Sequence, residues 1–273
     1  MAFSQANVIT TGITTFKSGK DATEACFGSA SGLFAGYQPW GPLVGTQDIQ
    51  GTVGPRRGKF GVADWVATTI GNAGTALTQV ATSYPAVGKI ITGTTADHDG
   101  YQYQWSTDGG STVDSALVPT AATVLIGYFR LKVDNAGTDA HTKSEFFVGV
   151  SSTDTAIYAS PAAVVGFVKA QGAATMVGEI GQGGTETDTA ALSSSLVDNT
   201  YIQLGFRVNG VTSIEFWQGT GSTIGGMSRV ATQTTVTNIP TTTGALSIAV
   251  GTDTNHAATD FYIQHAVAMQ EAL

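Results

Sequence analysis

The stretch TYIQLGFRVNGVTSIEFWQ, residues 200–218, decides the fold class of this 273-residue chain. Two runs of alternating apolar and polar residues flank Asn209-Gly210, a pair that favours the positive φ angles of a type I′ turn. The alternation predicts a β-hairpin with one buried face, because successive side chains of a strand point to opposite sides. The predicted buried residues are Ile202, Leu204, Phe206, Val208, Ile214 and Phe216.

The same period of two recurs in VLIGYFRLKV, residues 124–133. The alternation predicts a half-buried strand whose polar face includes Tyr128, Arg130 and Lys132. The residues predicted to face inward are Leu125, Phe129, Leu131 and Val133. Further strands are predicted at residues 101–106, 145–151, 163–169, 175–180, 245–250 and 260–268, the last followed by a short tail.

Composition agrees with this pattern. The chain contains 35 glycines and is crowded with Thr, Ser and Ala, which favours short strands and tight turns over long helices. We therefore predict an all-β fold, an antiparallel β-sandwich over residues 81–273. Residues 1–80 are rich in Gly, Ala and Thr but weakly periodic, so we expect an extended N-terminal assembly segment that orders against neighbouring subunits.

Charge and targeting signals exclude several classes of protein. The net charge is −8 and the twelve Lys and Arg are scattered, so we expect no direct nucleic-acid binding. The N-terminus MAFSQANVIT lacks the features of a signal peptide, and no run approaches the ~20 apolar residues of a membrane span. The single cysteine, Cys26, excludes an intrachain disulfide. These features predict cytoplasmic synthesis without a membrane anchor.

Seven motifs carry a family resemblance by their order along the chain. They are DHDGYQ at 97–102, YFRLKV at 128–133, EFFVGVSSTDTAI at 145–157, VGFVK at 165–169, TYIQLGFRVNGVTSIEFW at 200–217, IP at 239–240 and DFYIQHAV at 260–267. From about residue 90 onward, this order resembles tailed-phage virion proteins with a jelly-roll, concanavalin-like β-sandwich. The resemblance implies a virion structural protein of the capsid-decoration type and implies no catalytic residues.

Nothing in the sequence recommends catalysis. No G-x-S-x-G elbow exists among the serines, and the four histidines fall in predicted turns or a terminal strand. A polysaccharide depolymerase would need two carboxylates across a cleft. The glutamates Glu145, Glu179, Glu186 and Glu215 show no diagnostic context. We therefore predict that the chain is not an enzyme.

Metal binding has one weak candidate. Asp97 and Asp99 lie in a short acidic turn that contains glycine, and such turns can supply oxygen ligands to Ca²⁺. Asp and Gly also form turns without any ion, and no segment completes a twelve-residue calcium loop. We expect no cofactor, with Ca²⁺ as the single possibility.

Exposed aromatic side chains offer a second kind of site. Trp105, Trp217, Tyr101 and Tyr103 are candidates for stacking on sugar rings in a lectin-like groove. Core packing is the usual fate of such residues and is the alternative interpretation.

Arg56, Arg57 and Lys59 form the one basic cluster. They are candidates for docking onto an acidic patch of a coat-protein lattice, with a solvated turn as the alternative. We thus predict a virion protein that contacts the major capsid protein or other virion proteins and forms homo-oligomers. The alternative function is a carbohydrate-binding, lectin-like module for host recognition on a tail or capsid fibre.

Overall fold

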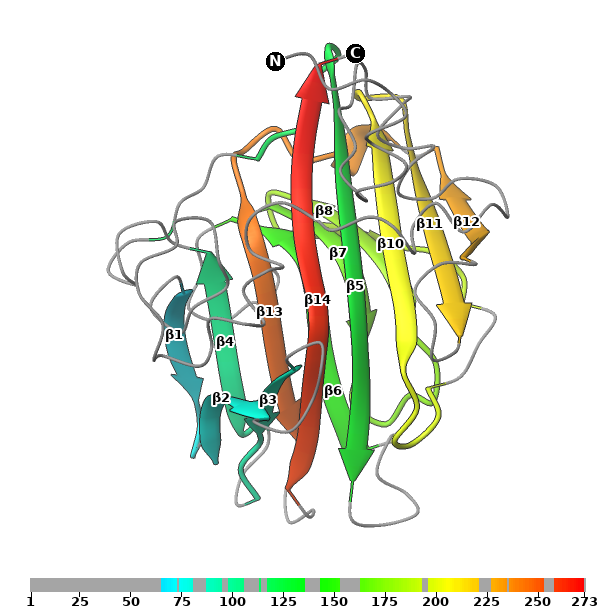
Figure 1. Cartoon of the computed structure of the whole chain (residues 1–273). Helices are drawn as coiled ribbons and strands as arrows, with labels where there is room; N and C mark the ends of the chain where they lie inside the picture. Colours follow the sequence, from blue (N-terminus) through cyan, green and yellow to red (C-terminus); the bar gives the residue numbers. More distant parts are fainter. Residues whose placement is uncertain are drawn as a thin grey trace, which may run out of the picture.

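A computed structural model describes residues 65–72, 74–80, 87–94, 98–105, 113, 117–135, 143–152, 163–192, 196–220, 227–234, 236–252 and 258–272. These residues form two antiparallel seven-stranded sheets that pack face to face (Figure 1). The predicted all-β jelly-roll sandwich is confirmed. Among the described residues, no helix is long and apolar enough to cross a membrane.

The two sheets are named by their strands in spatial order. Sheet A consists of β1 (Trp65–Ile70), β4 (Gly100–Trp105), β13 (Ala245–Thr252), β6 (Ser144–Ser151), β7 (Ala163–Lys169), β8 (Val177–Gln182) and β9 (Thr185–Asp188). Sheet B consists of β12 (Ser228–Gln233), β11 (Ser213–Thr220), β10 (Ile202–Asn209), β5 (Thr123–Asn135), β14 (Thr259–Ala272), β3 (Val87–Ile91) and β2 (Thr75–Val80). A short 3-10 helix, η4 (Val236–Asn238), precedes β13.

The hairpin of β10 and β11 is confirmed, but its turn differs from the prediction. Asn209 pairs with Ser213 across the ladder, so Gly210, Val211 and Thr212 form the connection. Gly210 has φ of +58°, whereas Asn209 does not adopt a positive φ. Asn209 stays in the strand because β10 also pairs with β5, where Asn209 lies opposite Val124.

Aromatic side chains from both sheets form the core between them. Phe167 of β7 meets Phe216 of β11 edge to face, with ring centroids 5.4 Å apart. Phe146 of β6 packs on Phe261 of β14 at 5.5 Å. The inward residues predicted for 124–133 all belong to this core. Period-two alternation therefore identified the buried face correctly.

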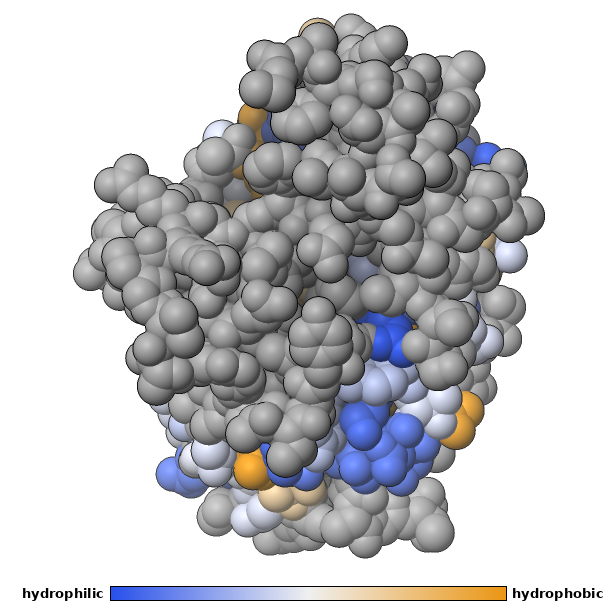
Figure 2. Space-filling model, viewed as in Figure 1, coloured by the Kyte–Doolittle hydropathy of each residue, from blue (hydrophilic) through white to orange (hydrophobic). Residues whose placement is uncertain are grey.

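The outer face of sheet B is less exposed than predicted. Tyr128 is fully buried and Arg130 is 3% exposed, so β5 is buried on both faces. The Tyr128 hydroxyl donates to Gln203, and the Arg130 guanidinium lies 4.2 Å from the ring centre of Tyr201. Hydrophilic residues gather toward the bottom of the view in Figure 2, where β5 ends and β14 begins. The prediction of a half-buried strand is wrong because these polar side chains pack on one another.

The two sheets include strands that precede residue 81, the position at which the sequence predicts the sandwich to begin. β1 pairs with β4 at the edge of sheet A, and β2 pairs with β3 at the edge of sheet B. Trp65 of β1 enters the core and packs edge to face on Trp105 at 5.7 Å. Residues 1–64 lie outside the described residues.

Candidate functional site

The outer face of sheet A carries an unusual set of polar residues. Phe146 and Val148 point into the core, so Glu145 and Phe147 point outward from β6. Ile180 points inward from β8, which places Glu179 on the same outer face. Strand alternation alone therefore sets both glutamates on one surface.

Glycines on neighbouring strands make room for these side chains. A Cβ atom at Gly251 of β13 would lie 2.5 Å from the Glu145 Oε1 atom. At Gly149 and Gly166, a Cβ would lie 2.6 Å and 2.9 Å from atoms of the Phe147 ring. At Gly181, a Cβ would lie 3.0 Å from the Glu186 side chain. The glycines thus let Glu145, Phe147 and Glu186 pack closely against the neighbouring strands, and a hollow remains between these side chains.

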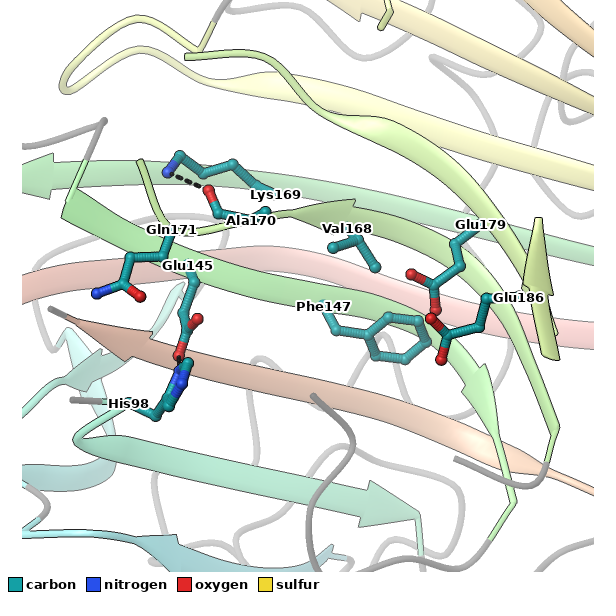
Figure 3. Close-up of a pocket in the computed structure, with 9 residues that line it drawn as sticks. All are labelled: His98, Glu145, Phe147, Val168, Lys169, Ala170, Gln171, Glu179 and Glu186. Carbon is teal, nitrogen blue, oxygen red and sulfur yellow. Dashed lines mark hydrogen bonds and ion pairs between the residues drawn. The ribbon is translucent and has the colours of Figure 1, made fainter. Parts of the chain in front are cut away.

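The hollow is a pocket of about 270 Å³ on this face. We call it the outer groove. It is lined by His98, Glu145, Phe147, Val168, Lys169, Ala170, Gln171, Glu179 and Glu186. Figure 3 shows two polar ends, with His98 and Glu145 at one, Glu179 and Glu186 at the other, and Phe147 and Val168 between them.

The outer groove runs diagonally across three strands. Gly149 pairs with Gly166, which pairs with Glu179, so Glu179 lies two strands from β6 and four residues along from Glu145. Standard strand spacing and rise make this diagonal roughly 16 Å. The groove is therefore elongated rather than round.

At the first end, His98 and Glu145 form a close pair. The His98 Nδ1 atom lies 2.5 Å from Glu145 Oε1, and the Glu145 side chain is 6% exposed. His98 has φ of +60°, which few residues other than glycine adopt. Next to it, the buried Asp99 accepts a hydrogen bond from the Asn72 backbone at 2.6 Å. This bond fixes the loop that presents His98.

Lys169 lies beneath the same end. It is fully buried and donates to the backbone carbonyls of Ser144 and Ala170. Burial lowers the pKa of Lys169 to about 8, although the nearby Glu145 acts in the opposite direction. Its ammonium group is therefore committed to the protein backbone.

At the second end, Glu179 is a buried carboxyl group that faces other acids. The residue is 8% exposed, and the part of the chain that the structure describes provides no hydrogen-bond partner for its side chain. Burial, together with the smaller effect of the charges of Glu186 and Asp188 on β9, raises the pKa of Glu179 to about 8. At neutral pH, Glu179 therefore carries a proton and can donate it.

The aromatic residues proposed for sugar stacking do not meet in one groove. Tyr101, Tyr103 and Trp105 lie on the core-facing side of β4, where Tyr103 is 2% exposed. Trp217 lies on the outer face of sheet B, in the other layer of the sandwich.

Of the remaining predicted site residues, one does not line the outer groove and the others lie outside the described residues. Asp99 is buried and occupied by the hydrogen bond to Asn72, while Asp97 lies outside the described residues. Arg56, Arg57 and Lys59 lie outside them too. Within the described part of the chain, no three His, Cys, Asp or Glu side chains are placed to hold a metal ion.

The sequence contained the groove residues but gave no sign that they belong together. Of the four glutamates considered, Glu145, Glu179 and Glu186 line the groove. Glu215 lies on sheet B, where it pairs with Arg229 at 2.7 Å. The one available signal was glycine in strands that otherwise carry bulky residues, since such glycines mark a close approach.

Comparison with known proteins shows the fold alone. No protein-family model matches the chain, and no curated protein matches its sequence. Alginate lyase A1-II', a member of polysaccharide lyase family 7, is 8% identical with a TM-score of 0.50, covering 77% of this chain and 96% of that one. An endo-1,3-β-glucanase from Streptomyces sioyaensis is 13% identical with a TM-score of 0.50, covering 83% and 95%. A protein of unknown function from Shewanella oneidensis MR-1 is 12% identical with a TM-score of 0.50, covering 76% and 79%.

These structures correct the prediction that the chain is not an enzyme. Two of the three are carbohydrate-active enzymes with the same sandwich fold. The fold therefore gives no reason to exclude catalysis. The absence of a recognisable sequence motif was a poor guide, because catalytic carboxyl groups are brought together by strand register and need not be neighbours in sequence.

Proposed function

We propose that the chain binds carbohydrate in the outer groove of sheet A. The observation that carries this proposal is the groove's elongated shape, in which half-buried Val168 above the buried Phe147 lies between two ends that offer hydrogen-bonding groups. Pyranose rings present an apolar face and a rim of hydroxyl groups, which matches such a surface. The elongated groove suits several linked sugar units better than a single small ligand.

Blocking the groove tests this proposal. Val168 is half-buried and points outward into the floor, so Val168→Trp would fill the space without touching the core. We expect the variant to weaken oligosaccharide binding at least about tenfold, or 1.4 kcal/mol. Calorimetric titrations with hexamers of β-1,3-glucose, β-1,4-glucose, N-acetylglucosamine, glucosamine and mannuronate would measure this. Arg229→Gln, on the outer side of sheet B, is the matched control and should bind like the wild type.

We also propose that the protein binds carbohydrate on a virus particle, on the basis of the family resemblance. The motif order over residues 97–267 supports a place on a tailed-phage particle, where a glycan groove would contact the host surface. In this proposal, residues 1–64 contribute to homo-oligomer and coat contacts, with Arg56, Arg57 and Lys59 facing an acidic patch of the coat. Saturable co-sedimentation of the full chain with coat-protein shells tests it.

Glycoside hydrolysis is a second candidate function, favoured by the protonated Glu179 beside Glu186. The Glu179 carboxyl would transfer its proton to the glycosidic oxygen as the bond to the anomeric carbon breaks. The Glu186 carboxylate would take a proton from the water that attacks that carbon. One water is consumed, and the two carboxyl groups exchange protons with solvent to return to the starting state.

Glu179→Gln separates hydrolysis from binding. If Glu179 is the general acid, the variant should lose about 100-fold or more of the turnover, because its amide cannot transfer a proton. Binding of the uncharged hexamers should change by less than about threefold, since the side chain keeps its shape. Reducing ends released from the hexamers that bind would be counted. Equal turnover in wild type and variant would rule out this role for Glu179.

A further inference from the structure

The second end of the outer groove has an uncompensated negative charge. Glu179 on β8 lies opposite Asp188 in the β8 and β9 ladder, and Glu186 lies opposite Gly181. All three carboxyl groups therefore lie on one face of two adjacent strands. Among the described residues, Glu186 and Asp188 form no ion pair.

Three lysines of the described chain interact with groups other than these acids. Lys169 lines the groove but donates to two backbone carbonyls. Lys89 pairs with Asp260 at 2.6 Å, and Lys132 lies 4.4 Å from the ring centre of Tyr262, both on the outer face of sheet B. Within the described residues, the Lys and Arg side chains that pair with acids, Lys89, Arg207 and Arg229, all lie on sheet B.

Besides this cluster of acids, the burial of the Glu179 side chain points to a ligand. It is 92% buried, it has no hydrogen-bond partner among the described residues, and its side chain lines the groove. Its carboxyl oxygens are not among the fully buried atoms that lack a partner, so they open onto the groove, where a ligand can supply a hydrogen-bond donor or a positive charge. A metal ion fits poorly, because the described residues hold no cluster of three suitable ligands.

We propose that the outer groove selects a glycan containing amino sugars, whose ammonium group lies between Glu179 and Glu186. This inference rests on the proposed carbohydrate-binding function and names its ligand class. Ammonium groups form strong, charge-assisted hydrogen bonds with carboxylates, and the burial of Glu179 reduces screening by solvent. A uronic acid polymer would instead bring negative charge to an end that already carries three carboxyl groups.

Proton release is a second consequence of this arrangement. Glu179 carries its proton at neutral pH because burial and the neighbouring carboxylates raise its pKa. An ammonium group within a few ångströms favours the charged carboxylate and lowers that pKa. Binding near pH 6, where the amino groups of the free ligand are already mostly protonated, should therefore release up to one proton per site. General-acid hydrolysis needs the opposite, a Glu179 that keeps its proton when the sugar is bound.

The test compares glucosamine hexamer with N-acetylglucosamine hexamer, which has the same length but no charge. Binding to the full chain is measured by calorimetry in buffers of different ionisation enthalpy, which reports proton release. We expect the glucosamine hexamer to bind at least about tenfold more tightly at low salt, with the preference shrinking as salt rises. Glu186→Gln, at an exposed position, should abolish most of that preference, and Glu215→Gln on sheet B should not.

Each other outcome has a distinct meaning. If the acetylated hexamer binds as tightly as glucosamine hexamer, the amino-sugar inference fails and carbohydrate binding stands. If the wild type binds none of the hexamers, the proposed function fails as well. Equal binding of trilysine would show that the groove recognises ammonium groups without sugar, and CaCl₂ that displaces glucosamine hexamer would show a metal site. Either result overturns the inference.

Discussion

Phe216→Ala is expected to lower the free energy of unfolding by about 3–5 kcal/mol. Phe216 is fully buried on β11 and meets Phe167 of the opposite sheet edge to face. Its ring also lies against Gly178 of β8, where a Cβ would lie 2.6 Å from it. Because Gly178 has no side chain to move into the space, truncation leaves a cavity between the sheets.

Urea denaturation of the full chain, followed by circular dichroism, measures this loss. Val197→Ala is the control, because Val197 is 59% exposed and its truncation should cost less than about 0.5 kcal/mol. A loss below about 1 kcal/mol for Phe216→Ala would show that the two sheets do not close over this residue.

Glu179→Gln is expected to change the pH dependence of stability. The pKa of Glu179 is raised from 4.5 to about 8 in the folded state, so the folded chain keeps a proton that the unfolded chain loses. Stability conferred by this group is present below about pH 4.5 and declines as pH rises to about 8. The shift corresponds to a decline on the order of 5 kcal/mol. Glu179→Gln should remove it and be the more stable protein at pH 8.

Thermal and urea unfolding between pH 4.5 and 8 would measure this decline in the free energy of unfolding. Glu215→Gln, on the other sheet, is the control and should keep the wild-type decline. Glu186→Gln should reduce the decline only in part, because burial is the main cause of the shifted pKa and Glu186 adds to it. Parallel profiles for wild type and Glu179→Gln would mean that the Glu179 carboxyl is solvated and ionised in the folded protein.

Lys169 affects the free energy of unfolding above about pH 8, and its effect is opposite to that of Glu179. Its pKa is lowered from 10.5 to about 8, so the unfolded chain binds the proton more tightly than the folded chain. Stability contributed through this group rises as pH increases from about 8 to 10.5. The two groups together predict a stability minimum near pH 8.

Strands with a clear apolar alternation were predictable from the sequence. Each of the nine predicted strand regions contains a strand, and 260–268 extends to Ala272 as β14 instead of ending in a tail. Five strands were missed, β1, β2, β3, β9 and β12, and all of them except β3 lie at sheet edges. β9 is TETD, without an apolar residue, and β1 lies in a region whose surroundings are weakly periodic. Both are edge strands held by one neighbour, so burial imposes little pattern on them.

The sequence by itself determined the β-sandwich, because an alternating strand can bury its apolar side chains only against a second layer. It also determined which side of β5 and β10 forms the core. Tertiary structure alone decided the outer groove. Glu145 and Glu186 are separated by three strand connections, and the order and register of β6, β7, β8 and β9 decide how near they lie to Glu179 on their shared face. Register depends on turn geometry and on which faces pack into the core, so it is settled only when the strands pair in the folded sheet.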